Sequence, residues 1–142
     1  MLIVLPESDK RGTHSESMGK VQIVELLSSG SFKDEAGVVF HEACHALWDS
    51  KPKSDLIVLQ QDFEKAGGAK AYVEIYESLA SALGQGWFNE SAFGTSPKSW
   101  YGGNPTYNAY GHSLFPLVVE YLTQGKTIDA QFAKLATECF KK

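Results

Sequence analysis

The pattern of apolar and polar positions predicts a short β-sheet near the start of the chain. Residues 2–5 and 21–27 are short runs dominated by Leu, Ile and Val, a composition typical of strands. Residues 7–20 between them are polar and contain Ser and Gly, so we expect a loop there. A Ser-Ser-Gly-Ser turn follows at residues 28–31. The pattern therefore predicts two strands before the first helix.

Beyond this turn, apolar residues recur at the three- and four-residue spacing of helices. Glycines at 67–68 and at 84 and 86 are expected to end two of them. Residues 87–111 are rich in Gly, Asn, Pro and aromatic residues, which predicts a long loop. The expected helices cover residues 32–48, 54–65, 70–83, 113–123 and 127–141. Together these elements predict an α+β fold, mainly helical, with a short sheet packed on the first helix.

Length and composition are those of an ordinary globular protein. The 142 residues suit a single domain over residues 1–142, with 43% hydrophobic and 21% charged residues. The net charge is −4 and the basic residues are scattered, so we expect no nucleic-acid partner. No apolar run approaches the length of a membrane span. Oligomeric state and cellular compartment stay open, and the sequence is compatible with a segment of a longer protein.

Two further features of composition bear on location and redox state. Residues 1–5 are apolar, but Pro6 and Glu7 follow at once and no charged segment precedes them, so we expect no signal peptide. Cys44 and Cys139 are the two cysteines, too few for a disulfide framework. Cys44 lies inside the first expected helix and is interpreted as a small core residue; a bond between the two cysteines stays open.

The candidate chemistry lies in the sequence His-Glu-Ala-Cys-His at residues 41–45. On a helix, residues four apart are separated by about 40° around the axis and about 6 Å along it. The imidazoles of His41 and His45 can therefore reach one metal ion at about 2.0–2.1 Å. Glu42 is rotated by about 100° from His41, so it is better placed to contact a water on the metal than to bind the metal. Two nitrogen ligands, a carboxylate base and an open position predict a catalytic zinc site.

The residues around this motif also support the prediction of a catalytic zinc site. Glu42 is the one charged residue from Ala36 to Trp48, and no Pro interrupts this run. At this point the chain resembles the zincin metallopeptidases, whose extended pattern asks for a β-branched residue at the position of Val38, uncharged neighbours and a hydrophobic residue at the position of Leu47. The resemblance implies a Zn²⁺-dependent hydrolase acting on a peptide or protein substrate, with Glu42 as the general base.

The third zinc ligand follows from a subgroup of that family. The metzincin subgroup would supply a third His soon after His45, and the sequence that follows contains none. The gluzincin subgroup supplies a Glu within Asn-Glu-x-x-Ala, and residues 76–80 match this pattern except that Tyr76 replaces Asn. The resemblance therefore implies Glu77 as the ligand, with Ala80 allowing close approach of its helix. Glu74 is the second choice, followed by a last group of alternatives: Glu90, Glu120 and His112.

Zincins commonly carry a His or Tyr that donates a hydrogen bond to the oxyanion of the tetrahedral intermediate. The long loop predicted after the Glu77 helix could deliver one, with His112 as the first candidate, followed by Tyr110 and Tyr107. The resemblance also implies that residues 21–27 are an edge strand that pairs with substrate, with an interior strand as the alternative. Ser81, one turn after Glu77, could support the ligand where some relatives have Asp.

Two other classes of function stay open. One is a zinc-binding module of the same fold that lacks peptidase activity and acts in protein interaction. The other is a helical domain without enzymatic activity, in which the motif arises by chance. Metal content separates the last class from the other two, and peptide hydrolysis separates the enzyme from the inactive module.

Overall fold

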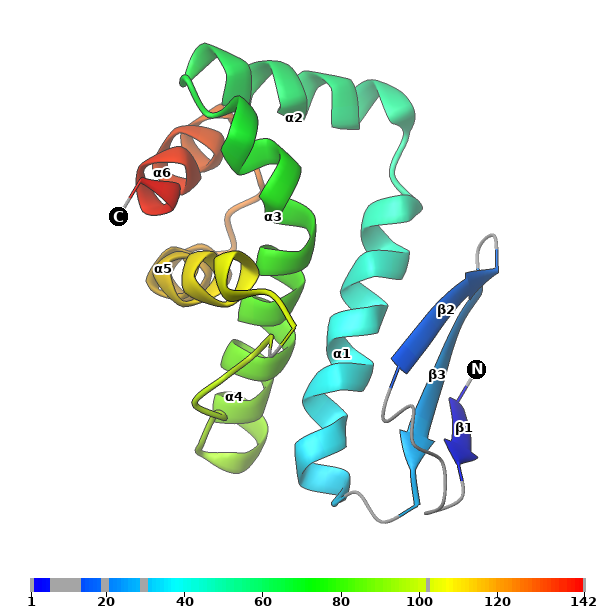
Figure 1. Cartoon of the computed structure of the whole chain (residues 1–142). Helices are drawn as coiled ribbons and strands as arrows, with labels where there is room; N and C mark the ends of the chain where they lie inside the picture. Colours follow the sequence, from blue (N-terminus) through cyan, green and yellow to red (C-terminus); the bar gives the residue numbers. More distant parts are fainter. Residues whose placement is uncertain (1, 6–13, 19–20, 29–30, 102, 142) are drawn as a thin grey trace.

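Helices make up most of the protein, as expected (Figure 1). The computed structural model describes residues 2–5, 14–18, 21–28, 31–101 and 103–141. Its helices are α1 (Phe32–Asp49), α2 (Lys53–Lys65), α3 (Ala69–Ser81), the π-helix η1 (Ala82–Phe88), α4 (Asn89–Phe93), α5 (Pro105–Thr123) and α6 (Ala130–Phe140). None of the helices in this described part of the chain is both long and apolar enough to span a membrane.

The sheet contains strands β1 (Leu2–Leu5), β2 (His14–Met18) and β3 (Val21–Leu27), in the order β1-β3-β2. β1 runs parallel to β3, and β2 runs antiparallel to it. β3 is therefore the central strand, and the expectation that residues 21–27 form an edge strand is wrong. The expected loop over residues 7–20 is also wrong at β2. Backbone pairing with β3 offsets the poor strand propensity of its His-Ser-Glu-Ser-Met sequence.

Helix α1 lies between the sheet and the other helices (Figure 1). It contacts β3 on one side and α3 and η1 on the other. Val24 of β3 and Ala36 of α1 are both buried. His41 and His45 of α1 are both buried, and a buried polar side chain needs a partner.

The main core lies between α2, α3, α5 and α6. Its fully buried large side chains include Phe63, Ile75 and Leu114, one from each of the first three of these helices. Each such side chain contributes about 1.5–3 kcal/mol by leaving water. This core fixes α3, and therefore Glu77, independently of any metal.

The region expected to be a loop, residues 87–111, is partly helical. α5 begins at Pro105 because the Asn104 side chain accepts hydrogen bonds from the backbone N–H groups of Thr106, at 2.9 Å, and Tyr107, at 3.4 Å. Proline at the first helical position lacks the N–H that would otherwise be unsatisfied there. His112 therefore lies within a helix rather than at the end of a loop.

The expected helix end at Gly84 and Gly86 is also wrong, since the chain continues through both as the π-helix η1. Both glycines are buried at close contacts between elements. A Cβ on Gly84 would lie 2.5 Å from the carbonyl oxygen of Gly37 in α1. A Cβ on Gly86 would lie 2.9 Å from the rings of Phe115 and Trp100. These glycines allow close packing and do not end the helix.

Candidate metal centre

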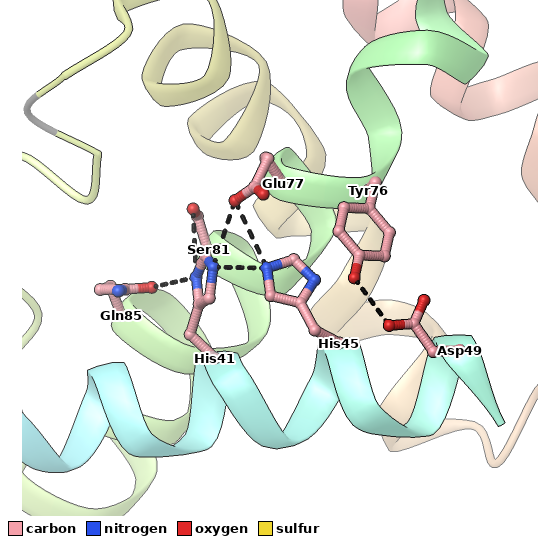
Figure 2. A network of polar contacts seen from close by, with 7 residues as sticks. All are labelled: His41, His45, Asp49, Tyr76, Glu77, Ser81 and Gln85. Carbon is pink, nitrogen blue, oxygen red and sulfur yellow. Dashed lines mark hydrogen bonds and ion pairs between the residues drawn. The ribbon is translucent and has the colours of Figure 1, made fainter. Parts of the chain in front are cut away.

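The two histidines of the motif point to the same side of α1, toward α3 and η1 (Figure 2). Both are buried, with exposed fractions of 3% for His41 and 5% for His45. Their Nε2 atoms lie 2.9 Å apart. The helical spacing of the motif predicted this convergence, and it is confirmed.

Glu77 reaches the same point from α3. Its Oε2 atom lies 3.3 Å from Nε2 of His41 and 3.4 Å from Nε2 of His45. Ala80, one turn later on α3, is buried. Among the residues that the structure describes, these three form the one group of His, Cys, Asp and Glu side chains arranged to hold a metal ion.

The spacing of the three donor atoms fits a tetrahedral ion. Bonds of about 2.1 Å at tetrahedral angles place neighbouring ligand atoms about 3.4 Å apart. The two distances to Glu77, 3.3 and 3.4 Å, match this value, and the distance between the histidines, 2.9 Å, is somewhat shorter. Three protein donors would leave one tetrahedral position for water or substrate.

The other candidates for the third ligand lie elsewhere. Glu90 accepts a hydrogen bond from Ser96, and Glu120 forms an ion pair with Lys126. Glu74 lies on α3 but is not part of the donor group.

The charge state of Glu77 suits a ligand. Partial burial raises its pKa, but hydrogen bonds from His41 and then His45, together with the charges of these histidines, outweigh burial and lower the pKa to about 2. Its carboxylate is therefore ionised at neutral pH, as metal binding requires.

Each histidine ring is held in a different way (Figure 2). Nδ1 of His41 lies 3.2 Å from Oε1 of Gln85 and 3.5 Å from Oγ of Ser81. The ring of His45 stacks on Tyr76, with centroids 4.1 Å apart and planes 23° apart. The sequence predicted a supporting role for Ser81 beside Glu77, whereas in the structure Ser81 contacts His41. The contact of Gln85 was not predicted.

Tyr76, which stands where the gluzincin pattern has Asn, is itself anchored. Its hydroxyl donates a hydrogen bond to Oδ2 of Asp49, at 3.2 Å. Asp49 is the last residue of α1, so this bond ties α3 to the helix that carries His45. Tyr76 thus joins α3 to the end of α1.

Glu42 lies close enough to the site to affect it electrostatically. Its carboxylate is half-buried and has no hydrogen-bond partner among the described residues. Its negative charge contributes, after larger causes, to raising the pKa of Tyr76 and of Tyr101. Glu42 therefore lies within electrostatic range of two tyrosines whose rings contact the histidines of the motif.

The three candidates for the oxyanion donor have other surroundings. The hydroxyl of Tyr110 is buried and donates to the carbonyl oxygen of Ala136 in α6, at 3.1 Å. His112 is exposed and stacks on Trp100, with centroids 3.8 Å apart. In the described part of the chain, it makes no hydrogen bond, ion pair or ring contact with the donor group. Tyr107 contacts the ring of Tyr101 edge to face.

Tyr101 makes a ring contact with a histidine of the motif, although the sequence did not single it out. Its ring centroid lies 6.3 Å from that of His41. Burial, followed by the charges of Glu77, Tyr107 and Glu42, raises the pKa of Tyr101, so its hydroxyl keeps its proton at neutral pH. The one local signal was an aromatic pair, Trp100-Tyr101, inside a glycine-rich segment.

No protein-family model matches the sequence, and comparisons with curated proteins and with solved structures give no match either. The zincin resemblance therefore rests on the residues themselves. The two cysteines are not joined by a disulfide bond.

Proposed function

We propose that this protein is a zinc-dependent peptidase of the gluzincin type. The observation that supports it best is the convergence of His41, His45 and Glu77, with donor atoms 2.9 to 3.4 Å apart. A carboxylate that follows the first histidine, and that has no partner of its own among the described residues, adds the base that hydrolysis needs.

Zinc is the metal favoured by these donors. Two imidazole nitrogens and one carboxylate, with a fourth position left over, form the ligand set of catalytic zinc sites in peptidases. An all-oxygen set would instead favour magnesium or calcium. Bound zinc would polarise the scissile carbonyl and lower the pKa of a water molecule to about 7.

Glu42 performs the proton transfers in the proposed reaction. It accepts a proton from the attacking water as the water oxygen bonds to the carbonyl carbon. It then delivers that proton to the leaving nitrogen as the C–N bond breaks, which regenerates the carboxylate.

Tyr101 is our preferred donor to the developing oxyanion, in place of His112. Its ring lies beside His41, and its hydroxyl is protonated at neutral pH. A neutral O–H can donate to negative charge that appears on the carbonyl oxygen only in the transition state. His112 faces solvent and stacks on Trp100, so it would have to leave that ring to act on a substrate.

Metal analysis and a peptide digest test the proposal together. Purified wild-type protein should contain about one zinc per chain and should cleave a mixed peptide pool, as read by mass spectrometry. Glu42→Gln should keep its zinc and lose at least about 10²–10⁴-fold in activity. Glu77→Gln should lose zinc, whereas Glu74→Gln, on the same helix outside the donor group, serves as the matched control and should resemble wild type.

Two results would contradict the proposal in different ways. If a His41→Ala, His45→Ala double variant kept its full zinc content, the proposed ligands would be wrong. Stoichiometric zinc in a wild-type protein that cleaves no peptide would instead favour the alternative, a catalytically inactive zinc-binding module.

A further inference from the structure

We infer that Gln85, carried by the π-helix η1, is a positioning residue that fixes the ring orientation and tautomer of His41 for metal binding. This inference rests on the metal site proposed above. It assigns a use to the π-helix and to a buried polar side chain that the proposed reaction does not otherwise employ.

The contact between the two side chains is buried and specific. Oε1 of Gln85 lies 3.2 Å from Nδ1 of His41, and the exposed fractions are 8% for Gln85 and 3% for His41. Nε2 of His41 faces Glu77 and His45. An amide oxygen only accepts hydrogen bonds, so pairing with it places a proton on Nδ1; once a metal replaces the proton that Nε2 shares with Glu77, Nε2 offers it a lone pair. That is the tautomer a metal ligand needs.

Ser81 cannot do this alone. Its Oγ is farther from Nδ1 of His41, at 3.5 Å, than Oε1 of Gln85. A hydroxyl pairs with either tautomer by rotating its O–H, whereas Gln85 presents its amide oxygen to Nδ1 and would have to turn its amide over to donate. Gln85 is therefore the residue that we expect to select the Nδ1–H form, with Ser81 in a minor role.

The π-helix explains how Gln85 comes to face His41. On an α-helix, each step of four residues overshoots a full turn by about 40°, so Ser81 is already rotated by that amount from Glu77. A second α-helical step would rotate Gln85 by about 80° from Glu77. The wider π-helix, with i→i+5 hydrogen bonds and about 4.4 residues per turn, undershoots by about 30° over four residues.

The overshoot of the α-helical step and the undershoot of the π-helical step nearly cancel. Gln85 therefore lies on the same face of the helix as Glu77. Figure 2 shows Glu77, Ser81 and Gln85 gathered around the His41 ring. Buried Gly84 brings this part of η1 against the backbone of His41, because a Cβ there would lie 2.8 Å from its backbone nitrogen. The change of helix type and the adjacent glycine thus serve the same contact.

His45 provides an internal comparison. Its ring is held by stacking on Tyr76, and no hydrogen bond to its Nδ1 occurs among the described residues. A change at Gln85 should therefore alter the signals of His41 and leave those of His45 nearly unchanged.

The experiment combines zinc affinity with NMR of the zinc-loaded protein. Gln85→Leu should bind zinc about 10–100-fold more weakly than wild type, the usual effect of removing a partner behind a ligand. Competition with a chromophoric chelator measures this loss. In zinc-loaded protein, the Nδ1 proton of His41 should show a downfield shift and cross-peaks to Gln85, and the shift should be lost in Gln85→Leu.

Two variants separate positioning from general packing. Gln85→Glu keeps an acceptor oxygen at the same reach and should restore zinc affinity to within about threefold of wild type or better, because a carboxylate partner makes the imidazole more basic. Ser81→Ala, on the same face one turn earlier, should change zinc affinity by less than about threefold.

Zinc affinity of Gln85→Leu within twofold of wild type, or an unchanged Nδ1 signal of His41, would overturn the inference and leave the proposed function standing. Absence of peptidase activity in a wild-type protein that binds zinc would contradict the proposed enzyme, while the affinities and NMR signals would still decide the role of Gln85. Wild-type protein that takes up no zinc would overturn the metal site and this inference together.

Discussion

Replacing Gly84 with alanine is expected to weaken zinc binding without touching a ligand. The added Cβ would lie 2.5 Å from the carbonyl oxygen of Gly37, and 2.8 Å from both the Cβ and the backbone nitrogen of His41. Carbon atoms pack best at about 3.5–4.0 Å, so the contact with the His41 Cβ falls short by about 0.7–1.2 Å. The obstructing atoms belong to the backbone and to a Cβ, so no side-chain rotation can relieve the clash.

Relief therefore requires η1 and α1 to separate by several tenths of an ångström or more. Metal sites tolerate donor displacements of about 0.2 Å. Overpacking of this kind costs about 1–3 kcal/mol. Alanine gains up to about 1 kcal/mol over glycine in helix propensity, which does not offset the clash. We expect net destabilisation and a loss of zinc affinity of at least about tenfold, or 1.4 kcal/mol.

Urea unfolding of the metal-free protein and chelator competition measure these two effects separately. Gly37→Ala is the comparison on α1, because its Cβ would meet the side chain of buried Asn89, 2.7 Å away, and not the backbone or the Cβ of His41. Gly103→Ala is the open control, with its nearest neighbour 3.9 Å away. A Gly84→Ala variant with the stability and zinc affinity of wild type would refute the argument that close approach of η1 positions His41.

Three further outcomes are expected. Tyr101→Phe should lower kcat by about 10²–10³-fold with unchanged zinc content, because one oxyanion donor is lost. A wild-type kcat in this variant would contradict the role of Tyr101 and leave His112 as the candidate donor. Removing zinc with a chelator should lower the melting temperature, since zinc at 100 times its Kd contributes about 2.7 kcal/mol; equal melting curves would argue against binding to the folded state. Cys44 should react with iodoacetamide at pH 8 about tenfold more slowly than an ordinary thiol, because burial raises its pKa to about 11 and the lower thiolate fraction outweighs the greater nucleophilicity of that thiolate. Mass spectrometry of the Cys44 peptide measures the rate, and labelling as fast as in urea-unfolded protein would contradict the prediction.

Local periodicity alone determined the first part of the metal site. His41 and His45 are four residues apart in an uninterrupted apolar helix, so their convergence follows from helix geometry. Glu77 lies on another helix, and no periodicity could link it to the histidines. Its assignment came from resemblance to a family pattern, and the structure brings it within 3.4 Å of both histidines.

Tertiary packing decided what surrounds those three residues. Gln85 faces His41 because the chain continues as a π-helix through two glycines, where local propensity predicted an end. Glycine ends a helix in isolation, but here the missing Cβ allows contact with another element, and that contact offsets its poor propensity.

The same physical reason separates the other successes from the errors. The strand over residues 21–27 was predictable from its side chains, but its central place in the sheet depends on β1 and β2, which pair with it from elsewhere in the chain. Tyr101 lies beside His41 because Trp100 packs into the core and α5 begins early, at Asn104 and Pro105. Sequence by itself determined that two histidines of one helix converge. Only the tertiary structure decided which distant residues surround them, because those contacts depend on elements that meet in space and not along the chain.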